Sequence, residues 1–284
     1  MTNRIQYVLA VGICALPSFV LAEGGSPWLP IPGQTALSVS QTQQSGDSAY
    51  IGSNKLPISA ITGGGAKNYR RSATGLSIGY GISDSLALDA AISYSTVKVG
   101  AADSDSGLND TTIGLRYRVV DEFEGNGLPT VTLRGGAIIK GNYDGARLAS
   151  IGKGANGLDF SVLVGKQITP EFSLQGELGF QNRSKSVPNA TYYDITSRYR
   201  LGGGFAVSAG YNSKNYGGNL DIGGAGFTPA RFQQVREERA GFRIGVGYSI
   251  ARNQGLDLTF GKTTSGRNTV KDDSSIRLAY TIGL

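Results

Sequence analysis

Apolar and polar residues alternate with a period of two along most of this chain. In residues 72–82, Leu76, Ile78, Tyr80 and Ile82 fall on one face, and glycine and serine fill most of the other. Side chains of a β-strand alternate between its two faces, whereas a helix repeats every 3.6 residues. Helical periodicity is almost absent from the sequence, so the pattern predicts an all-β protein.

About twelve segments alternate in this way, each close to the roughly 9–11 residues that a tilted membrane strand needs. They are residues 35–44, 72–82, 86–97, 110–119, 130–140, 158–168, 172–183, 191–201, 205–212, 239–250, 256–264 and 274–284. The connections after even-numbered segments are short, apart from residues 120–129, and those after odd-numbered segments are mostly long, apart from residues 184–190. This asymmetry predicts a transmembrane antiparallel up-and-down β-barrel of about twelve strands over residues 35–284.

Aromatic residues gather near the ends of the predicted strands. One set stands near the ends of even-numbered strands: Tyr80, Tyr117, Tyr199, Tyr248 and Tyr280. A second set stands towards the other end of the barrel: Tyr94, Tyr211, Phe180 and Phe260. Tyrosine is also a good strand former, but that preference predicts no particular position within a strand. We therefore predict two interfacial girdles of aromatic side chains.

The amino end has the features of a secretory signal peptide over residues 1–22. Arg4 gives a positive start, residues 5–20 are almost continuously apolar, and Val20-Leu21-Ala22 is a small-residue cleavage pattern. A lipoprotein anchored through Cys14 is the alternative, although the bulky Ile13 before it does not suit that modification. We expect export and a location in the Gram-negative outer membrane.

Residues 23–34 are rich in proline and glycine and predict an irregular periplasmic N-terminal segment. Two roles are open for Trp28, either an anchor at the membrane interface or packing inside the barrel mouth. The single cysteine would leave with the signal peptide, so the exported chain would contain no disulfide bond.

The inward faces of the predicted strands carry many charges, with more basic than acidic side chains. The candidate pore-lining residues are Arg116, Arg118, Arg134, Asp159, Glu177, Asp194, Arg198, Arg200, Arg243, Asp257 and Arg277. One interpretation is a narrow water-filled pore whose surplus arginine favours anionic or polar solutes. The other is a closed interior filled by Arg–Asp pairs. A barrel of about twelve strands is wide enough for a channel unless a loop fills it, and residues 45–71 and 213–238 are glycine-containing loops that could fold inward.

Few features point to catalysis, a cofactor or a metal. The sequence contains no histidine, one cysteine and no nucleotide-binding motif followed by a helix, so we expect no cofactor and no metal site. The net charge of +6 has no basic run with it, so we expect no nucleic-acid partner.

The last eleven residues resemble the closing strand of a bacterial outer-membrane barrel. Every even position from Ile276 to Leu284 is large and apolar, although the family most often ends in Phe. The resemblance implies that the barrel-assembly machinery recognises this strand, and that outer-membrane lipid and lipopolysaccharide surround the barrel. Barrel phospholipases, palmitoyl transferases, lipid A deacylases and omptin-type proteases share the architecture, but as families they rely on a histidine. We therefore expect no enzyme.

The glycine-rich inward faces and the length also resemble the outer-membrane transporters associated with aromatic-compound catabolism, the phenol-degradation MetA-pathway family. This resemblance implies a channel for passive uptake or exchange of small polar, anionic or aromatic solutes. Two alternatives stay open: a non-conducting structural or adhesive barrel that acts through its external loops, and an export pore for a polymer.

Overall fold

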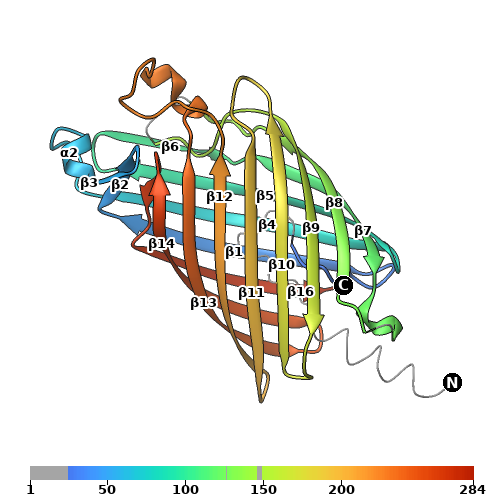
Figure 1. Cartoon of the computed structure of the whole chain (residues 1–284). Helices are drawn as coiled ribbons and strands as arrows, with labels where there is room; N and C mark the ends of the chain where they lie inside the picture. Colours follow the sequence, from blue (N-terminus) through green and yellow to red (C-terminus); the bar gives the residue numbers. More distant parts are fainter. Residues whose placement is uncertain (1–24, 126, 146–148) are drawn as a thin grey trace.

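The computed structural model describes residues 25–125, 127–145 and 149–284, and the predicted signal peptide lies outside this range. Twelve antiparallel strands form a closed barrel (Figure 1). They are β1 (Thr35–Gly46), β4 (Tyr69–Ser83), β5 (Leu86–Val99), β7 (Thr111–Val120), β8 (Thr130–Ile139), β9 (Gly157–Gln167), β10 (Phe172–Arg183), β11 (Ala190–Gly202), β12 (Phe205–Tyr216), β13 (Glu238–Ala251), β14 (Gln254–Arg267) and β16 (Ser274–Gly283). The predicted fold class is confirmed.

The barrel closes where the first and last strands pair. Residues 36–45 of β1 lie opposite residues 274–283 of β16 in an unbroken antiparallel register. The backbone amide and carbonyl of Thr35 exchange hydrogen bonds with those of Leu284, at 2.8 and 2.9 Å. This pairing removes the two open edges that an unclosed sheet would present.

The distribution of side chains is the reverse of that in a water-soluble barrel. Large apolar residues on the outer face are exposed, as shown by Ile113 at 48%, Ile244 at 54% and Leu278 at 50%. Charged residues such as Arg116 and Asp159 are completely buried on the inner face. An apolar exterior around a polar interior suits a sheet surrounded by lipid. No helix within the described part of the chain is long and apolar enough to cross a membrane.

The tyrosines predicted to form girdles lie on the outer face. Those of the first set stand at the end of the barrel with the short turns, here called the short-turn end. There Tyr199 lies opposite Phe172, and the rings of Tyr248 and Phe205 are 4.7 Å apart. Tyr280 is half-buried and donates to Gln254. The exposed side chains are Tyr80, Tyr117, Tyr199, Tyr248, Tyr94 and Tyr211.

The long loops at the opposite end, here called the long-loop end, contain elements that the alternation did not predict. These are β2 (Ser48–Ile51), β3 (Asn54–Pro57), α2 (Ile58–Ile61), β6 (Asp103–Leu108), η2 (Pro229–Gln234) and β15 (Val270–Lys271), and η1 (Glu122–Glu124) lies at the short-turn end. Strands β2, β3 and β15 form a separate small sheet, and β6 pairs with β5 beyond the end of β7. Loop residues form a small apolar core with the long-loop ends of β4 and β5. Its members are Ile58, Ala66, Tyr69, Val97, Val99, Tyr143, Ala149 and Ile151. The loops are therefore folded structures over this end.

Candidate functional site

The barrel interior contains a buried group of charged residues and one tyrosine, here called the ionic layer. It comprises Asp89, Arg116, Arg134, Asp159, Glu177 and Tyr192, from six consecutive barrel strands. The Asp89 carboxylate forms ion pairs with Arg116 at 3.3 Å and with Arg134 at 2.9 Å. Arg134 forms a second ion pair, with Asp159 at 2.5 Å. The Tyr192 hydroxyl donates to Asp159 at 2.9 Å or to Glu177 at 3.2 Å. Shared carboxylates compensate the cost of burying these charges.

Inward-facing glycines make room for the long polar side chains. A methyl group on Gly114 would lie 2.7 Å from the Arg134 guanidinium, because that group crosses the neighbouring strand. Gly210 leaves room for Arg243 in the same way, because a methyl group on Gly210 would lie 2.9 Å from the Arg243 guanidinium. Much of the glycine on the inner faces is thus a requirement for space.

Residues 25–34 lie inside the barrel against the ionic layer. The carbonyl of Ser26 accepts from Arg116 at 3.2 Å, and that of Pro27 accepts from Thr132 at 2.6 Å. Trp28 donates through Nε1 to Glu122 at 2.8 Å. Of the two roles predicted for Trp28, the structure therefore shows packing inside the short-turn end of the barrel. Gly25 borders the cavity described below, and Gly33 donates to the rim residue Gly81. The segment therefore extends through the short-turn half of the lumen.

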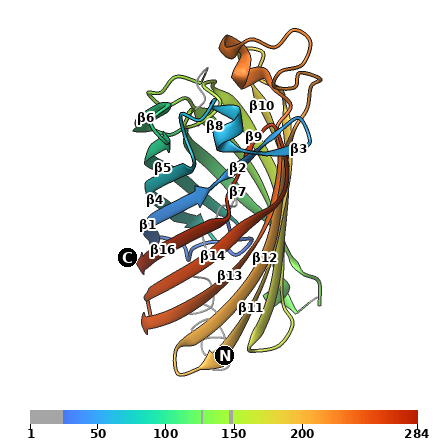
Figure 2. The ribbon, with the colours of Figure 1, turned by 90° about the vertical axis from the view of Figure 1, so that its left-hand side faces the viewer.

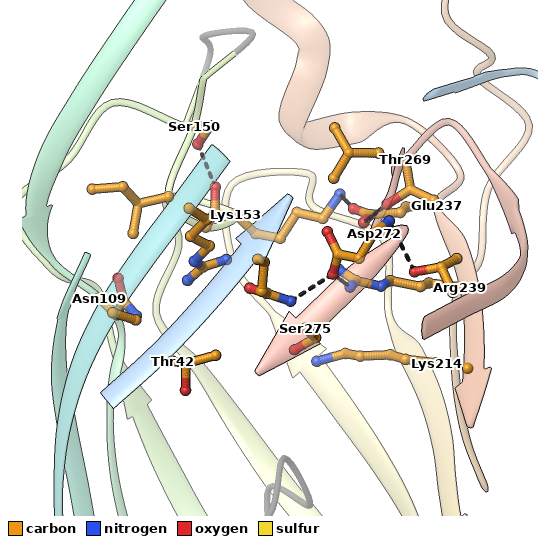
Figure 3. A pocket seen from close by; sticks show the side chains of 18 of the residues that line it. Thr42, Asn109, Ser150, Lys153, Lys214, Glu237, Arg239, Thr269, Asp272 and Ser275 are labelled. Atoms are coloured by element: carbon orange, nitrogen blue, oxygen red, sulfur yellow. Dashed lines mark hydrogen bonds and ion pairs between the residues drawn. The ribbon is translucent and has the colours of Figure 1, made fainter. Parts of the chain in front are cut away.

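The long-loop half contains a cavity of about 700 Å³, seen closely in Figure 3. Figure 2 shows the small strands β2 and β3 at this end of the barrel. Strands and loops both contribute polar and apolar side chains to the cavity wall. Polar residues of the strands include Thr42, Gln44, Asn212, Thr259, Thr263 and Ser275, and Asn109 lies between β6 and β7. Apolar residues between the barrel strands include Ile61, Ile222, Phe232 and Val235. Basic residues of the lining outnumber acidic ones: Arg71, Lys153, Arg183, Lys214, Arg239, Arg243, Lys262 and Arg277 against Asp89, Asp110, Glu237 and Asp272.

Two ion pairs lie at the cavity wall, one between two loops and one between a loop and β13 (Figure 3). Lys153 lies 2.5 Å from Glu237, which also accepts from Thr269 at 2.9 Å. Burial opposes ionisation of Glu237, but the Lys153 charge and these hydrogen bonds prevail and hold its pKa below the usual value. Asp272 pairs with Arg239 and accepts from Gln44, yet burial raises the pKa of Asp272.

Ten of the eleven predicted pore-lining residues fall into three groups, and Arg277 stands apart from them. Arg116, Arg134, Asp159 and Glu177 belong to the ionic layer. Arg118 and Arg200 contact the short-turn rim, through Asp121 and the carbonyl of Pro170. Asp194 pairs with Arg243 at 2.7 Å and Arg198 with Asp257 at 3.0 Å. Of the eleven predicted residues, Arg243 and Arg277 border the cavity.

Several cavity residues were missed by the sequence-based list. Lys214 lies on β12, which continues to Tyr216 and so extends beyond the predicted end at residue 212. Period-two alternation continued past Asn212 would have identified Lys214. Lys153, Glu237 and Asp272 lie in loops, where no periodicity indicates direction.

Comparisons with known proteins were made for the sequence and for the fold. The family described as MetA-pathway of phenol degradation matches residues 78–275. No curated protein matches the sequence. The fold is similar to the COG4313 outer membrane channel from Pseudomonas putida F1, with 17% identity and a TM-score of 0.68 over 90% of this chain and 97% of that one.

Two further solved structures share the fold at lower similarity. The NanC porin is 10% identical, with a TM-score of 0.52 over 87% of this chain and 100% of that one. The translocator domain of the autotransporter NalP from Neisseria meningitidis is 10% identical, with a TM-score of 0.50 over 99% of this chain and 95% of that one. At these identities the likeness concerns the fold.

Proposed function

The chain belongs to the family described as MetA-pathway of phenol degradation, and we propose that it is an outer-membrane channel for passive uptake or exchange of small polar, anionic or aromatic solutes. The observation that carries this proposal is the cavity of about 700 Å³ enclosed within a barrel whose exterior is apolar. A solute-sized space lined by both polar and apolar side chains suits molecules that combine a charged group with a hydrocarbon body. The solved channels and porins of similar fold support the same general role.

The charge of the cavity favours anions. The sequence predicted a surplus of arginine along the whole lumen, whereas in the structure the positive excess lies at the cavity. Most of the predicted arginines are neutralised by carboxylates, including Arg134 and Arg198. The positive excess that remains belongs to the cavity lining and to its loops. A positive wall of low dielectric attracts anions and disfavours cations. We therefore expect a modest anion preference that depends on cavity residues.

Passage to the short-turn side requires displacement of residues 25–34. The segment is held in the barrel by a few hydrogen bonds, which come from Arg116 and Thr132, go to Glu122, and join Gly33 and Gln34 to the backbone of Gly81. A channel built in this way opens by release of the segment while the barrel strands stay in place. Export through a cleaved signal peptide at residues 1–22 and recognition of β16 by the barrel-assembly machinery remain part of the proposal.

Single-channel recording in planar bilayers under a salt gradient tests this function. The expected result is discrete openings of the native chain, an anion-leaning reversal potential, and longer openings when residues 25–33 are deleted. The matched control is Arg118→Gln at the rim, which leaves the cavity unchanged. A folded barrel that stays silent both with and without residues 25–33 would refute the channel and turn attention to the external loops.

A further inference from the structure

One guanidinium on the cavity wall has no partner within the described part of the chain. Arg277 lies on β16, borders the cavity and is only 7% exposed, yet it makes no hydrogen bond or ion pair with any described residue. The charges that act on it are those of Arg243, which repels it, and Asp257, which is already paired with Arg198 at 3.0 Å. A buried cation normally has a compensating partner. Arg277 thus has donors available for an anion.

Arg243 supplies a second free donor close by. Its Nη2 atom donates to Asp194 at 2.7 Å, whereas its Nη1 atom is buried without a partner in the described structure. Arg243 lies opposite Gly261 of β14, and Arg277 lies opposite Thr259 of the same strand. Directly opposite residues have Cβ atoms about 5 Å apart. The two arginines therefore flank β14 on its lumen face, two residues apart in register.

Hydroxyl groups surround these donors. Thr42 lies opposite Arg277 on β1, Thr259 lies opposite it on β14, and Ser275 lies opposite Gly261; all three border the cavity. Figure 3 shows Thr42 and Ser275 on adjacent strands. Guanidinium forks and hydroxyls together match the oxygens of a carboxylate. The loop residues Ile61 and Phe232 offer apolar contact elsewhere in the same cavity.

We propose that Arg277, the Nη1 atom of Arg243 and the adjacent hydroxyls bind the carboxylate of a small organic anion, whose apolar part faces the loops. This inference rests on the proposed function, because it names the solute class for the same lumen. It differs from general anion attraction in requiring one particular guanidinium fork.

Equilibrium binding tests the site without requiring conduction. Isothermal titration calorimetry of the refolded chain in detergent would compare sodium benzoate, sodium acetate and inorganic phosphate. Benzoate is expected to bind more tightly than acetate, and Arg277→Gln to weaken benzoate at least about tenfold, because hydrogen bonds to a charged group are lost. Arg277→Lys should restore binding only in part, since lysine keeps the charge without the fork. The matched control is Arg118→Gln, which removes an equal charge from a residue that is paired with Asp121 outside the cavity and should bind like the native chain.

Equal benzoate affinity in the native chain and in Arg277→Gln would overturn the site. Phosphate binding tighter than benzoate would overturn the organic carboxylate as its ligand. A barrel that is silent in bilayers but binds benzoate through Arg277 would refute the channel and support the site. If Arg277→Gln does not fold, Thr259→Val provides the second test, and unchanged benzoate affinity there would count against the proposed geometry.

Discussion

Replacement of Arg134 by glutamine should destabilise the barrel strongly. The Arg134 side chain is fully buried and joins two carboxylates, those of Asp89 at 2.9 Å and Asp159 at 2.5 Å. Glutamine removes the charge and leaves both carboxylates in the ionic layer. Asp89 keeps Arg116 and Asp159 keeps Tyr192, so part of the network survives. Breaking a buried pair from one side costs about 3–5 kcal/mol, and this is the loss that we expect.

Urea unfolding in phospholipid vesicles, followed by circular dichroism, measures the free energy of unfolding directly. The matched control is Arg236→Gln in the loop before β13, where the pair with Glu238 is largely exposed and is worth about 0–1 kcal/mol. The double variant Arg134→Gln with Asp159→Asn should recover part of the loss, because it removes one of the stranded charges. A loss below about 1 kcal/mol for Arg134→Gln, equal to that of the control, would refute the ionic layer as a structural element.

Three further predictions follow from individual contacts. Gly114→Ala should cost about 1–3 kcal/mol of unfolding free energy by displacing a guanidinium, whereas Gly135→Ala, whose added methyl group meets only ordinary contacts at 3.7 Å, should be nearly neutral; thermal melts compare them. The Glu237–Lys153 pair has a depressed acid pKa, so its contribution is complete above the ordinary value of about 4.3 and is lost as pH falls through the folded value. Loop proteolysis should therefore accelerate only in acid below about pH 4, and unchanged cleavage there would contradict the pairing. Trp28→Phe removes the indole donor and should raise the open probability of the channel about tenfold or more; an unchanged open probability in bilayer recordings would show that the segment does not gate.

The barrel could be predicted from the sequence because its physical cause is local. Lipid on one face and a polar lumen on the other impose alternation on every strand, and Ile244 and Arg243 show it as neighbouring residues on opposite faces. The number of strands and the inward direction of the candidate charges follow from the same pattern. The β12 boundary at residue 212 was wrong by several residues, since the strand continues into the folded loops.

The division of the interior into an ionic layer, the segment of residues 25–34 and a cavity could not be predicted from the alternation. Whether an inward arginine is paired depends on strand tilt and register, which bring Arg134 to carboxylates on β5 and β9 but leave Arg277 without one. The position of residues 25–34 depends on backbone carbonyls meeting lumen side chains, and a Pro/Gly-rich segment has no periodicity to indicate it. The loop pair Lys153–Glu237 joins two segments far apart in the chain.

The pairing of β1 with β16 also constrains how the molecule assembles. Thr35 and Leu284 meet although nearly the whole chain separates them, and the other barrel strands pair with their neighbours in chain order. Joining two such distant segments of a flexible chain would cost about 5 kcal/mol in loop entropy. If the hairpins form in chain order, the sheet curves as strands are added, and its two edges end side by side. The seam therefore forms last and depends on every earlier hairpin. We expect refolding with a slow final step at the seam, and simultaneous loss of all strands once the seam opens.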